Sequence, residues 1–340
     1  MTVPIDSMTK GMKKKPKKIV VLGGAGLVGG NLVAVFLNDR EYRGKFSMVV
    51  VDKNKHNLEV LVSAFPPGSF KALNEDVTKQ DEWQQELKGA FAVVQLQAQI
   101  GHPTLQPFIR NNIESVKRVL TACKKAHIRN LIHISSSVVI SVANDHYTTT
   151  KRTGEDLVNR SGIPHTILRP PLMFGTFDSK YLGWLTRFMK KLPLFYPIPG
   201  SGRHMRQPLY VEDFARIIAR LVERNAPENK IYNIIGRERI DFIDLMRIIA
   251  EERGMRRVFV PIPIPVFIQL VRVYGLLNHV AGKKPMFIPD ELRRLIAGDD
   301  FPVTNWWDEF NVSYTPFRTA VRKTVKSPYD KYSKMMLNPN

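Results

Sequence analysis

The sequence predicts an α/β fold in which a doubly wound parallel sheet is accompanied by a smaller, mostly helical C-terminal lobe. Three observations support this fold class. Short apolar runs alternate with helical patterns from residue 18 to about 170, and these runs are apolar at successive positions. Beyond residue 170 the composition changes to segments rich in proline and aromatic residues. Strands that are apolar on both faces are typical of parallel sheets with helices packed on each side.

The elements follow in a regular order. Apolar runs of strand length are expected at residues 17–22, 46–54, 70–78, 90–99 and 130–140, with a long helix from about 107 to 126. After an intervening segment rich in proline and aromatic residues, the alternating pattern resumes and predicts a helix at 211–223 and a strand at 230–236. From 237 to about 326 the pattern is mostly helical, with a proline-studded break at 260–265.

This order predicts a division of the chain. Residues 18–170 together with 205–236 are expected to form a nucleotide-binding core, and residues 171–204 together with 237–326 the smaller lobe. Residues 1–17 are a basic tail that we expect to be flexible, and residues 327–340 a C-terminal tail.

Composition excludes several classes of protein. With 44% hydrophobic and 24% charged residues over 340 positions, the chain is globular rather than disordered. The single cysteine, Cys123, excludes an intrachain disulfide and a thiolate zinc cluster, which favours a reducing, cytoplasmic setting; its apolar surroundings predict a core position. The histidines lack metal-ligand spacing, so no metal site is expected. No signal peptide or spanning helix is predicted, and the apolar run 262–277 is expected to form a buried or surface-lying amphipathic helix.

The formal net charge of +20 points to an anionic partner or surface. No DNA- or RNA-binding motif accompanies the basic residues, so specific nucleic-acid recognition is not expected. Attraction to an anionic membrane, with a membrane-peripheral location, or a generally basic cellular proteome accounts for the charge.

A glycine-rich turn after the first strand carries the first chemical signal. Gly23, Gly26 and Gly29, with Leu27 and Val28 between them, stand where a strand turns into a helix. Such glycines allow a tight turn and close approach of the backbone to a pyrophosphate, whose charge then faces the helix N-terminus. Asp52 ends the second strand 23 residues after Gly29, where a carboxylate accepts hydrogen bonds from the adenosine ribose and repels a 2′-phosphate. The pattern predicts a Rossmann core that binds NAD; Lys53 and Lys55 keep NADP as the alternative.

Tyr147 and Lys151 carry the second signal. They lie four residues apart at the start of a helical pattern, so both side chains project from one helix face. A nearby ammonium stabilises a phenolate and draws the phenol pKa of about 10 towards neutrality, which makes the tyrosine a general acid or base. A serine run precedes the pair and offers a hydrogen-bond donor to a substrate oxygen.

Taken together, these motifs give a family resemblance. The sequence resembles the extended short-chain dehydrogenases, also called the NAD-dependent epimerase/dehydratase family, well over residues 18–240 and loosely beyond. The motifs that occur in the family's order are "GGAGLVG", "VVVD", "EDVT", "VVQLQAQ", "NNIESV", "IHISSSVV", "YTTTKRTGE", "ILRPPLMFG" and "RQPLYVEDFA". Within the family, the segments around 197–215, 167–175 and 232–236 look closest to an atypical branch that includes the accessory subunit of respiratory complex I.

The resemblance implies a role for each matching residue. Tyr147 would be the acid/base, Lys151 its partner and a binder of the nicotinamide ribose, and Ser136, with Ser137 as alternate, the substrate-facing serine. The remaining matches would contact the cofactor, or the substrate phosphate in the case of Arg206. They are Asp76, Val77, Leu96, Gln97, Ala98, Asn112, Pro170 and Arg206. The family also implies a homodimer through helices near 107–126 and 147–160.

Two departures from the family leave the small-molecule substrate open. Leu172 stands where nucleotide-sugar enzymes commonly carry asparagine, and the loop between Ser136 and Tyr147 is short. The expected activity is therefore hydride transfer at a hydroxyl or keto carbon by an NAD-dependent oxidoreductase. The alternatives are a nucleotide-sugar 4-epimerase, a cofactor-bound structural protein like the complex I subunit, and a hydroxysteroid or lipid-alcohol dehydrogenase.

Overall fold

A seven-stranded parallel sheet forms the centre of the molecule. The computed structural model describes residues 15–141, 143–192, 194–280, 282, 292, 295–298 and 300–336. The sheet has the order β11-β6-β5-β4-β1-β2-β3, and every pair in it is parallel. Its strands are β1 (Lys17–Leu22), β2 (Phe46–Val51), β3 (Lys71–Leu73), β4 (Ala92–Gln95), β5 (Leu131–Ile134), β6 (His165–Arg169) and β11 (Lys230–Asn233). The predicted fold class, a doubly wound α/β sheet, is confirmed.

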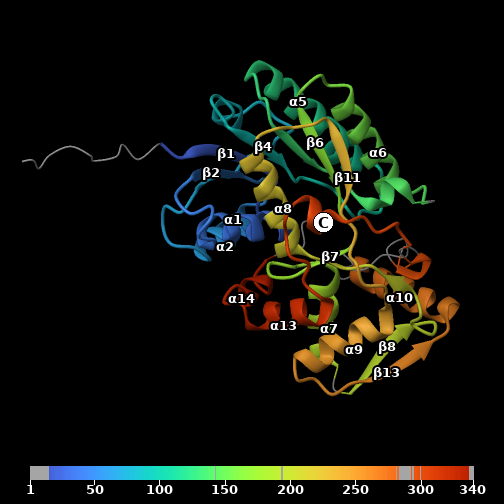
Figure 1. The fold of residues 1–340 in the computed structure, drawn as a ribbon. Coiled ribbons are helices and arrows are strands. Elements are labelled where there is room, and N and C mark those ends of the chain that lie inside the picture. The colour runs from blue at the N-terminus through green and yellow to red at the C-terminus, as the bar shows by residue number, and fades with distance from the viewer. Residues whose placement is uncertain are drawn as a thin grey trace, which may run out of the picture.

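Helices cover both faces of this sheet, because alternate strand residues point to opposite sides. In β1, Ile19 and Val21 enter one apolar core while Val20 and Leu22 enter the other. The first core is closed by α1 (Leu27–Asn38), α2 (Lys55–Ser63) and α8 (Val211–Arg224), and the second by α3 (Trp83–Glu86), α5 (Ser115–Lys125) and α6 (His146–Asn159). Figure 1 shows α1 and α8 side by side below the sheet, with α5 and α6 above it.

The helix expected at 107–126 is not one uniform α-helix. It consists of α4 (Gln106–Phe108), a π-helical segment η1 (Ile109–Glu114) and then α5. In the wider π-turn, the neighbouring residues Asn111 and Asn112 both reach Gln99, in the loop after β4. The π-helical segment therefore supplies two neighbouring side chains that hold the loop after β4.

A third core lies beyond the sheet. It joins α7 (Tyr181–Lys191), α9 (Phe242–Glu252) and α13 (Phe317–Lys326) through buried side chains such as Met189, Met246 and Phe317. Three two-stranded pairs accompany it: β7 (Met173–Phe174) with β10 (Leu209–Tyr210), β9 (Met205–Arg206) with β12 (Ile240–Asp241), and β8 (Phe195–Pro199) with β13 (Val258–Ile262). The remaining elements are η2 (Ser137–Ile140), α10 (Ile264–Val280), α12 (Trp306–Glu309) and α14 (Asp330–Ser333).

The proline-studded break expected at 260–265 separates α9 from α10, and β13 runs through its first part and pairs with β8. Prolines fit there since each strand of a two-stranded pair has one unpaired edge, where a missing N–H costs nothing. The helix expected at 262–277 is α10.

Two other expectations can be placed. Cys123 is fully buried in the second core, and burial raises the pKa of its thiol to about 12. Residues 1–14 and 337–340, which include most of the predicted N-terminal tail and the end of the C-terminal tail, lie outside the described residues. No helix of the described part is long and apolar enough to cross a membrane.

Candidate active site

One large cavity, of about 780 Å³, lies at the carboxyl ends of the central strands. Ligands of doubly wound sheets bind at this edge. Among the residues expected to bind cofactor or substrate, those that line the cavity are Gly23, Gly26, Leu27, Val28, Gly29, Asp52, Asp76, Val77, Leu96, Gln97, Ala98, Ser136, Ser137, Tyr147, Pro170 and Arg206. Lys151 and Asn112 lie outside this lining, in the layer behind it.

The glycine-rich turn forms one wall of the cavity, and its glycines are needed for different reasons. At Gly23 the backbone φ is +75°, and a Cβ would lie 2.6 Å from the backbone nitrogen of Gln97. At Gly29 a Cβ would lie 2.0 Å from the carbonyl oxygen of Gly24. At Gly26, the N-cap of α1, a Cβ would meet no protein atom within 4 Å. Gly23 and Gly29 therefore permit close packing, whereas Gly26 leaves open space at the helix N-terminus.

Asp52 connects the end of β2 to this turn. Its carboxylate oxygens accept hydrogen bonds from the amide of Ala25 and the amide of Asn54, both at 2.9 Å. Burial raises the pKa of Asp52, against these two hydrogen bonds and the charge of Lys53. The carboxylate thus holds the turn in place while it lines the cavity.

The cations near Asp52 are held by other groups. The Lys53 ammonium donates to the Asn111 side-chain oxygen at 2.6 Å, and Lys55 forms an exposed 3.9 Å pair with Glu59. Asp76 accepts from Arg110 at 2.7 Å. Burial acts to raise the pKa of Asp76, but hydrogen bonds from Thr78 and the charges of Lys53 and Arg110 outweigh it and lower that pKa.

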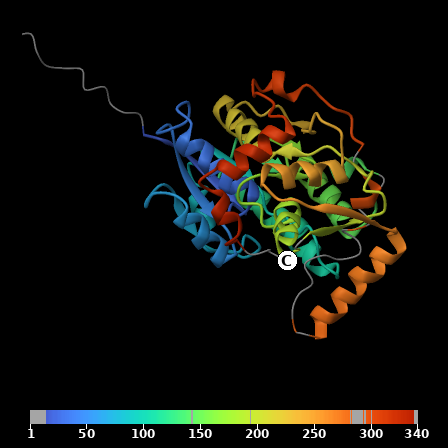
Figure 2. The same cartoon turned by 90° about the horizontal axis from the view of Figure 1, so that it is seen from below.

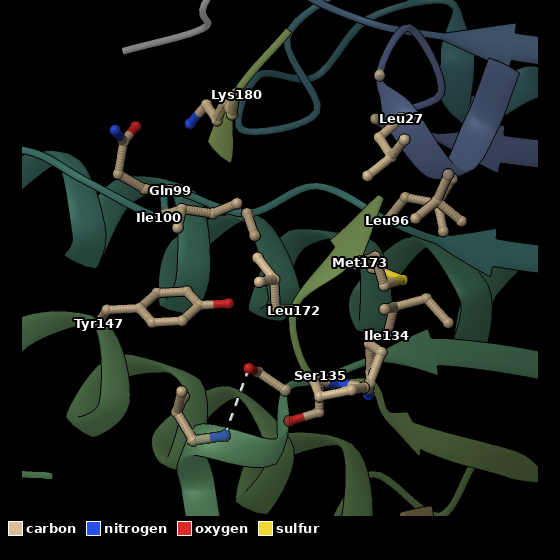
Figure 3. A pocket seen from close by; sticks show the side chains of 18 of the residues that line it. Leu27, Leu96, Gln99, Ile100, Ile134, Ser135, Tyr147, Leu172, Met173 and Lys180 are labelled. Atoms are coloured by element: carbon tan, nitrogen blue, oxygen red, sulfur yellow. Dashed lines mark hydrogen bonds between the residues drawn. The ribbon is translucent and has the colours of Figure 1, made fainter. Parts of the chain in front are cut away.

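Tyr147 and Lys151 occupy the first turns of α6. The helix begins there because Asp145 caps it, accepting from the Thr148 amide at 2.8 Å. Figure 3 shows the phenol of Tyr147 pointing into the cavity, with Met173 entering from the start of β7 and Leu172 from just before it, and with Leu27 and Leu96 on the side of the glycine-rich turn.

The Lys151 side chain runs beneath the cavity surface and is 3% exposed. Its ammonium donates to the carbonyl oxygen of Ile134, at the end of β5, at 2.7 Å. Burial lowers the pKa of Lys151 to about 8, although the nearby Glu155 carboxylate opposes the shift. A lysine near this pKa changes charge within the working range of many enzymes.

The three serines of the run make different contacts. Ser135 donates its hydroxyl to Glu155 at 2.7 Å, and the Ser137 amide donates to the carbonyl oxygen of Pro170 at 2.9 Å. Ser136 lines the cavity, and its hydroxyl oxygen accepts from the Val138 amide at 3.4 Å, which leaves its own proton available for another acceptor.

A buried ion pair behind Lys151 was missed by sequence reasoning. Glu155, one turn after Lys151, accepts from Arg169 through both carboxylate oxygens, and the two side chains are 6% and 18% exposed. This pair fixes α6 against β6. The spacing of four from Lys151 to Glu155 was the available signal, but nothing in the sequence indicates that Arg169, the last residue of β6, is the partner.

Asn112 acts from the second layer as well. Its side chain accepts from the Gln99 amide at 2.7 Å and donates to the Gln99 carbonyl and the Thr150 hydroxyl, both at 3.0 Å. It therefore ties the loop after β4 to the helix that carries Tyr147.

The other end of the cavity is built by residues that the sequence did not indicate. They are mostly apolar and come from α7, α9 and the segment near 295–302: Leu182, Trp184, Leu185, Phe242, Leu295, Phe301 and Pro302. Lys180 also reaches this end, and Arg206 lines it while one guanidinium nitrogen donates to the carbonyl oxygen of Leu295. In the described part of the chain no group of His, Cys, Asp or Glu residues is arranged to hold a metal ion.

The residues present fit a dinucleotide. Gly26 leaves room at the N-terminus of α1, a place suited to a pyrophosphate. The Gln97 side chain is buried in the cavity wall with neither its amide nitrogen nor its oxygen paired. A buried amide of this kind needs a partner, which a bound cofactor would supply.

Comparisons with known proteins agree with this fold. The profile of the NAD dependent epimerase/dehydratase family matches residues 19–234. A 3β-hydroxysteroid dehydrogenase/decarboxylase of Arabidopsis thaliana is 23% identical over 91% of this chain, which spans only 61% of that protein. The crystal structure of UDP-glucuronic acid 4-epimerase from Bacillus cereus in complex with NAD superposes with a TM-score of 0.68 at 20% identity, covering 93% of this chain and 98% of that one.

The resemblance to the complex I branch is weaker than the motifs implied. A subunit of the 1 alpha subcomplex of NADH dehydrogenase from Dictyostelium discoideum is 26% identical, but over 53% of this chain and 49% of that protein. The similarity supports the family as a whole and does not establish this branch within it.

Proposed function

The chain belongs to the NAD-dependent epimerase/dehydratase family, and from this premise we propose that it transfers hydride at a hydroxyl or keto carbon through Ser136, Tyr147 and Lys151. The observation that carries the proposal is the position of Tyr147. Its phenol points into the cavity that contains the glycine turn and Asp52, and Lys151 lies one helical turn behind it.

The proton chemistry falls to the protein. NAD, when bound, takes up or returns the hydride. Tyr147 would accept the proton of the substrate hydroxyl in the oxidative direction and return it in the reductive one. Lys151 would favour the phenolate by its positive charge, and Ser136 would donate a hydrogen bond to the substrate oxygen.

The glycine turn and Asp52 would bind the pyrophosphate and the adenosine ribose. Asp52 supports NAD over NADP, because its carboxylate would repel a 2′-phosphate. Lys53 keeps NADP as the second candidate, because its positive charge acts on Asp52 while its ammonium donates to the neutral Asn111 side chain; the charge of Lys55 is paired with Glu59.

For the substrate we propose an alcohol or ketone with a largely apolar body, as in a hydroxysteroid or lipid alcohol. The lining from α7 and α9 supports this, since Trp184, Leu185 and Phe242 offer few hydrogen-bond partners to a sugar ring. Leu172, which also enters the cavity, adds to the apolar surface. A nucleotide-sugar 4-epimerase is the second candidate, because Arg206 and Lys180 place two cations at the same end of the cavity.

The test compares Tyr147→Phe with the wild type. We expect NAD binding, measured by calorimetry, to stay within about threefold, and NAD reduction to fall by about 10²- to 10⁴-fold, the usual contribution of a general acid or base. Tyr329→Phe is the control, because the Tyr329 hydroxyl accepts an exposed hydrogen bond from Asn38 at 2.9 Å and does not line the cavity.

A panel of hydroxysteroids, long-chain secondary alcohols and UDP-sugars separates the substrate classes. Turnover of UDP-sugars alone would favour the epimerase. If NAD binds but no substrate is turned over and Tyr147→Phe changes nothing, the chain is a cofactor-bound structural protein and the proposed chemistry is wrong.

The family also supports a homodimer through η1, α5 and α6, which sedimentation analysis would test.

A further inference from the structure

The most unusual surface of the molecule is the outer side of α10. Among the described residues, α10 alone contributes seven of the large hydrophobic side chains that are exposed: Val266, Leu270, Val273, Tyr274, Leu276, Leu277 and Val280. Their exposed fractions run from 41% for Tyr274 to 79% for Val280. Soluble proteins rarely leave apolar side chains grouped in this way without a partner.

The pattern along α10 shows two apolar stripes rather than one. Val271 is buried, and Ile264, Ile268 and Gly275 are partly buried, so one stripe faces the body of the protein. On the other side, Val266, Leu270, Val273, Leu277 and Val280 recur at intervals of four and three residues, which is the spacing of a second helix face. Figure 2 shows this helix standing out from the rest of the molecule at one end.

The pair β8–β13, which leads into α10, adds to the surface. Phe195 and Val258 are register partners, and both are exposed, at 60% and 47%. Val260, two residues on, points to the same side and is 37% exposed. We call β8, β13 and the outer side of α10 the apolar edge.

Positive charge gathers along the chain segments that form the apolar edge, although Lys180 and Arg206 line the cavity and Arg253 pairs with Asp330. Residues 179–211 and 253–289 contain twelve lysines and arginines and no aspartate or glutamate. They include Lys190 and Lys191 just before β8, Arg256 just before β13 and Arg272 on α10, all of them exposed. These two segments therefore account for more than half of the net charge of +20.

We propose that the apolar edge docks on the surface of an anionic lipid bilayer, with α10 lying in the interface. The described helix has 17 residues and is about 26 Å long, shorter than the roughly 30 Å hydrocarbon core of a membrane. It carries Arg272 and Gln269 among its exposed residues. A helix of this kind lies along a membrane rather than across it, with its apolar face in the acyl region and its cations at the headgroups.

Charge also favours a membrane over a second copy of the chain as the occupant. Pairing two apolar edges would bring the exposed Lys190, Lys191, Arg256 and Arg272 of one copy close to those of the other. Anionic lipid headgroups neutralise the same cations, each contributing about 1 kcal/mol near the surface.

The apolar edge is connected to the cavity through α7. The N-terminal half of this helix gives Leu182, Trp184 and Leu185 to the cavity lining, and its last residues, Lys190 and Lys191, lead into β8. A membrane at the apolar edge would lie next to the elements that build the substrate end. The docking itself does not depend on the proposed catalytic chemistry.

Vesicle flotation with the full-length chain tests the proposal. We expect the wild type to bind vesicles of phosphatidylcholine that contain phosphatidylglycerol, to bind pure phosphatidylcholine much more weakly, and to dissociate as salt is raised. The double variant Leu270→Gln, Leu277→Gln removes two apolar side chains from the outer stripe and should weaken binding by at least about tenfold. Arg272→Gln should weaken it by about fivefold.

The control is Val62→Gln, Met335→Gln. These side chains are also exposed, at 44% and 50%, but lie in or beside α2 and α14, at the opposite side of the molecule from α10 in Figure 1. Vesicle binding should stay within about twofold for this variant, and circular dichroism should show all variants folded. NAD binding, measured in parallel without vesicles, should be unchanged in every variant.

Three results would overturn the proposal. The first is that the wild type does not bind anionic vesicles. The second is that the α10 double variant binds them as well as the wild type, which would assign binding to the lysine-rich N-terminal tail. The third is that the double substitution converts a dimer into a monomer in sedimentation while vesicle binding stays the same, which would make the outer stripe a contact between copies of the chain.

Discussion

The Glu155–Arg169 pair gives the sharpest test of how the structure supports the candidate site. We consider Glu155→Gln, which keeps the shape of the side chain and removes its charge. In the wild type, the carboxylate accepts from the Arg169 Nε at 3.1 Å and from the Ser135 hydroxyl at 2.7 Å, and both charged side chains are largely buried. Removing one partner of a buried ion pair leaves an uncompensated charge and costs about 3–5 kcal/mol.

We expect the lower end of this range, about 3 kcal/mol, because the glutamine oxygen still accepts one hydrogen bond from Arg169. The measurement is the free energy of unfolding in urea, followed by tryptophan fluorescence. The control is Glu59→Gln, since Glu59 forms a 3.9 Å pair with Lys55 in which both side chains are more than 60% exposed. Such a pair contributes at most about 0.5 kcal/mol. A loss below about 1 kcal/mol for Glu155→Gln would show that this ion pair contributes little to the stability of the fold.

The same variant should change the pH dependence of activity. Burial lowers the pKa of Lys151 to about 8, and Glu155 acts in the opposite direction, so its removal should lower that pKa further. The charged form of Lys151 is present below its pKa and is lost as pH rises through it. The alkaline limb of kcat should therefore move to lower pH in Glu155→Gln. A purely structural role of Glu155 predicts lower stability with the alkaline limb in its wild-type place.

Three further predictions follow from the cavity and the core. Gly26→Ala should leave the free energy of unfolding unchanged and weaken NAD binding by at least about tenfold, because its Cβ enters only the open space at the N-terminus of α1. Gly29→Ala should lower the free energy of unfolding, because its Cβ would lie 2.0 Å from the carbonyl oxygen of Gly24. Urea unfolding and calorimetry separate the two effects, and equal losses of stability in the two variants would contradict these roles. Asp52→Asn should narrow the preference for NAD over NADP by about tenfold in competition binding, because the charge that repels a 2′-phosphate is removed, and an unchanged ratio would mean that Asp52 does not face the ribose. Cys123, fully buried and with its thiol pKa raised to about 12, should react with Ellman's reagent only as fast as the chain unfolds; rapid reaction in native buffer would show that the second core opens.

Local patterns in the sequence were sufficient for the sheet and for the glycine-rich turn and Asp52, which line one wall of the cavity. Strands apolar on both faces and helical spacing between them predict a parallel sheet, because both faces must be covered. Gly23, Gly29 and Asp52 were also predictable, because the tight turn and the carboxylate at the strand end lie within short, contiguous motifs. Tyr147 and Lys151 were predictable as a pair because helical periodicity alone puts them on one face.

Other features depend on which distant segments meet, and only the tertiary structure decided these. The partner of Glu155 is Arg169 because α6 packs on β6, and the apolar end of the cavity forms because α7 and α9 converge there with residues near 295–302. The apolar run at 262–280 reads the same whether it is buried or exposed, since periodicity describes a helix and not its surroundings. The fold leaves the outer face of α10 uncovered beside exposed lysines and arginines, and this arrangement carries the proposed membrane contact.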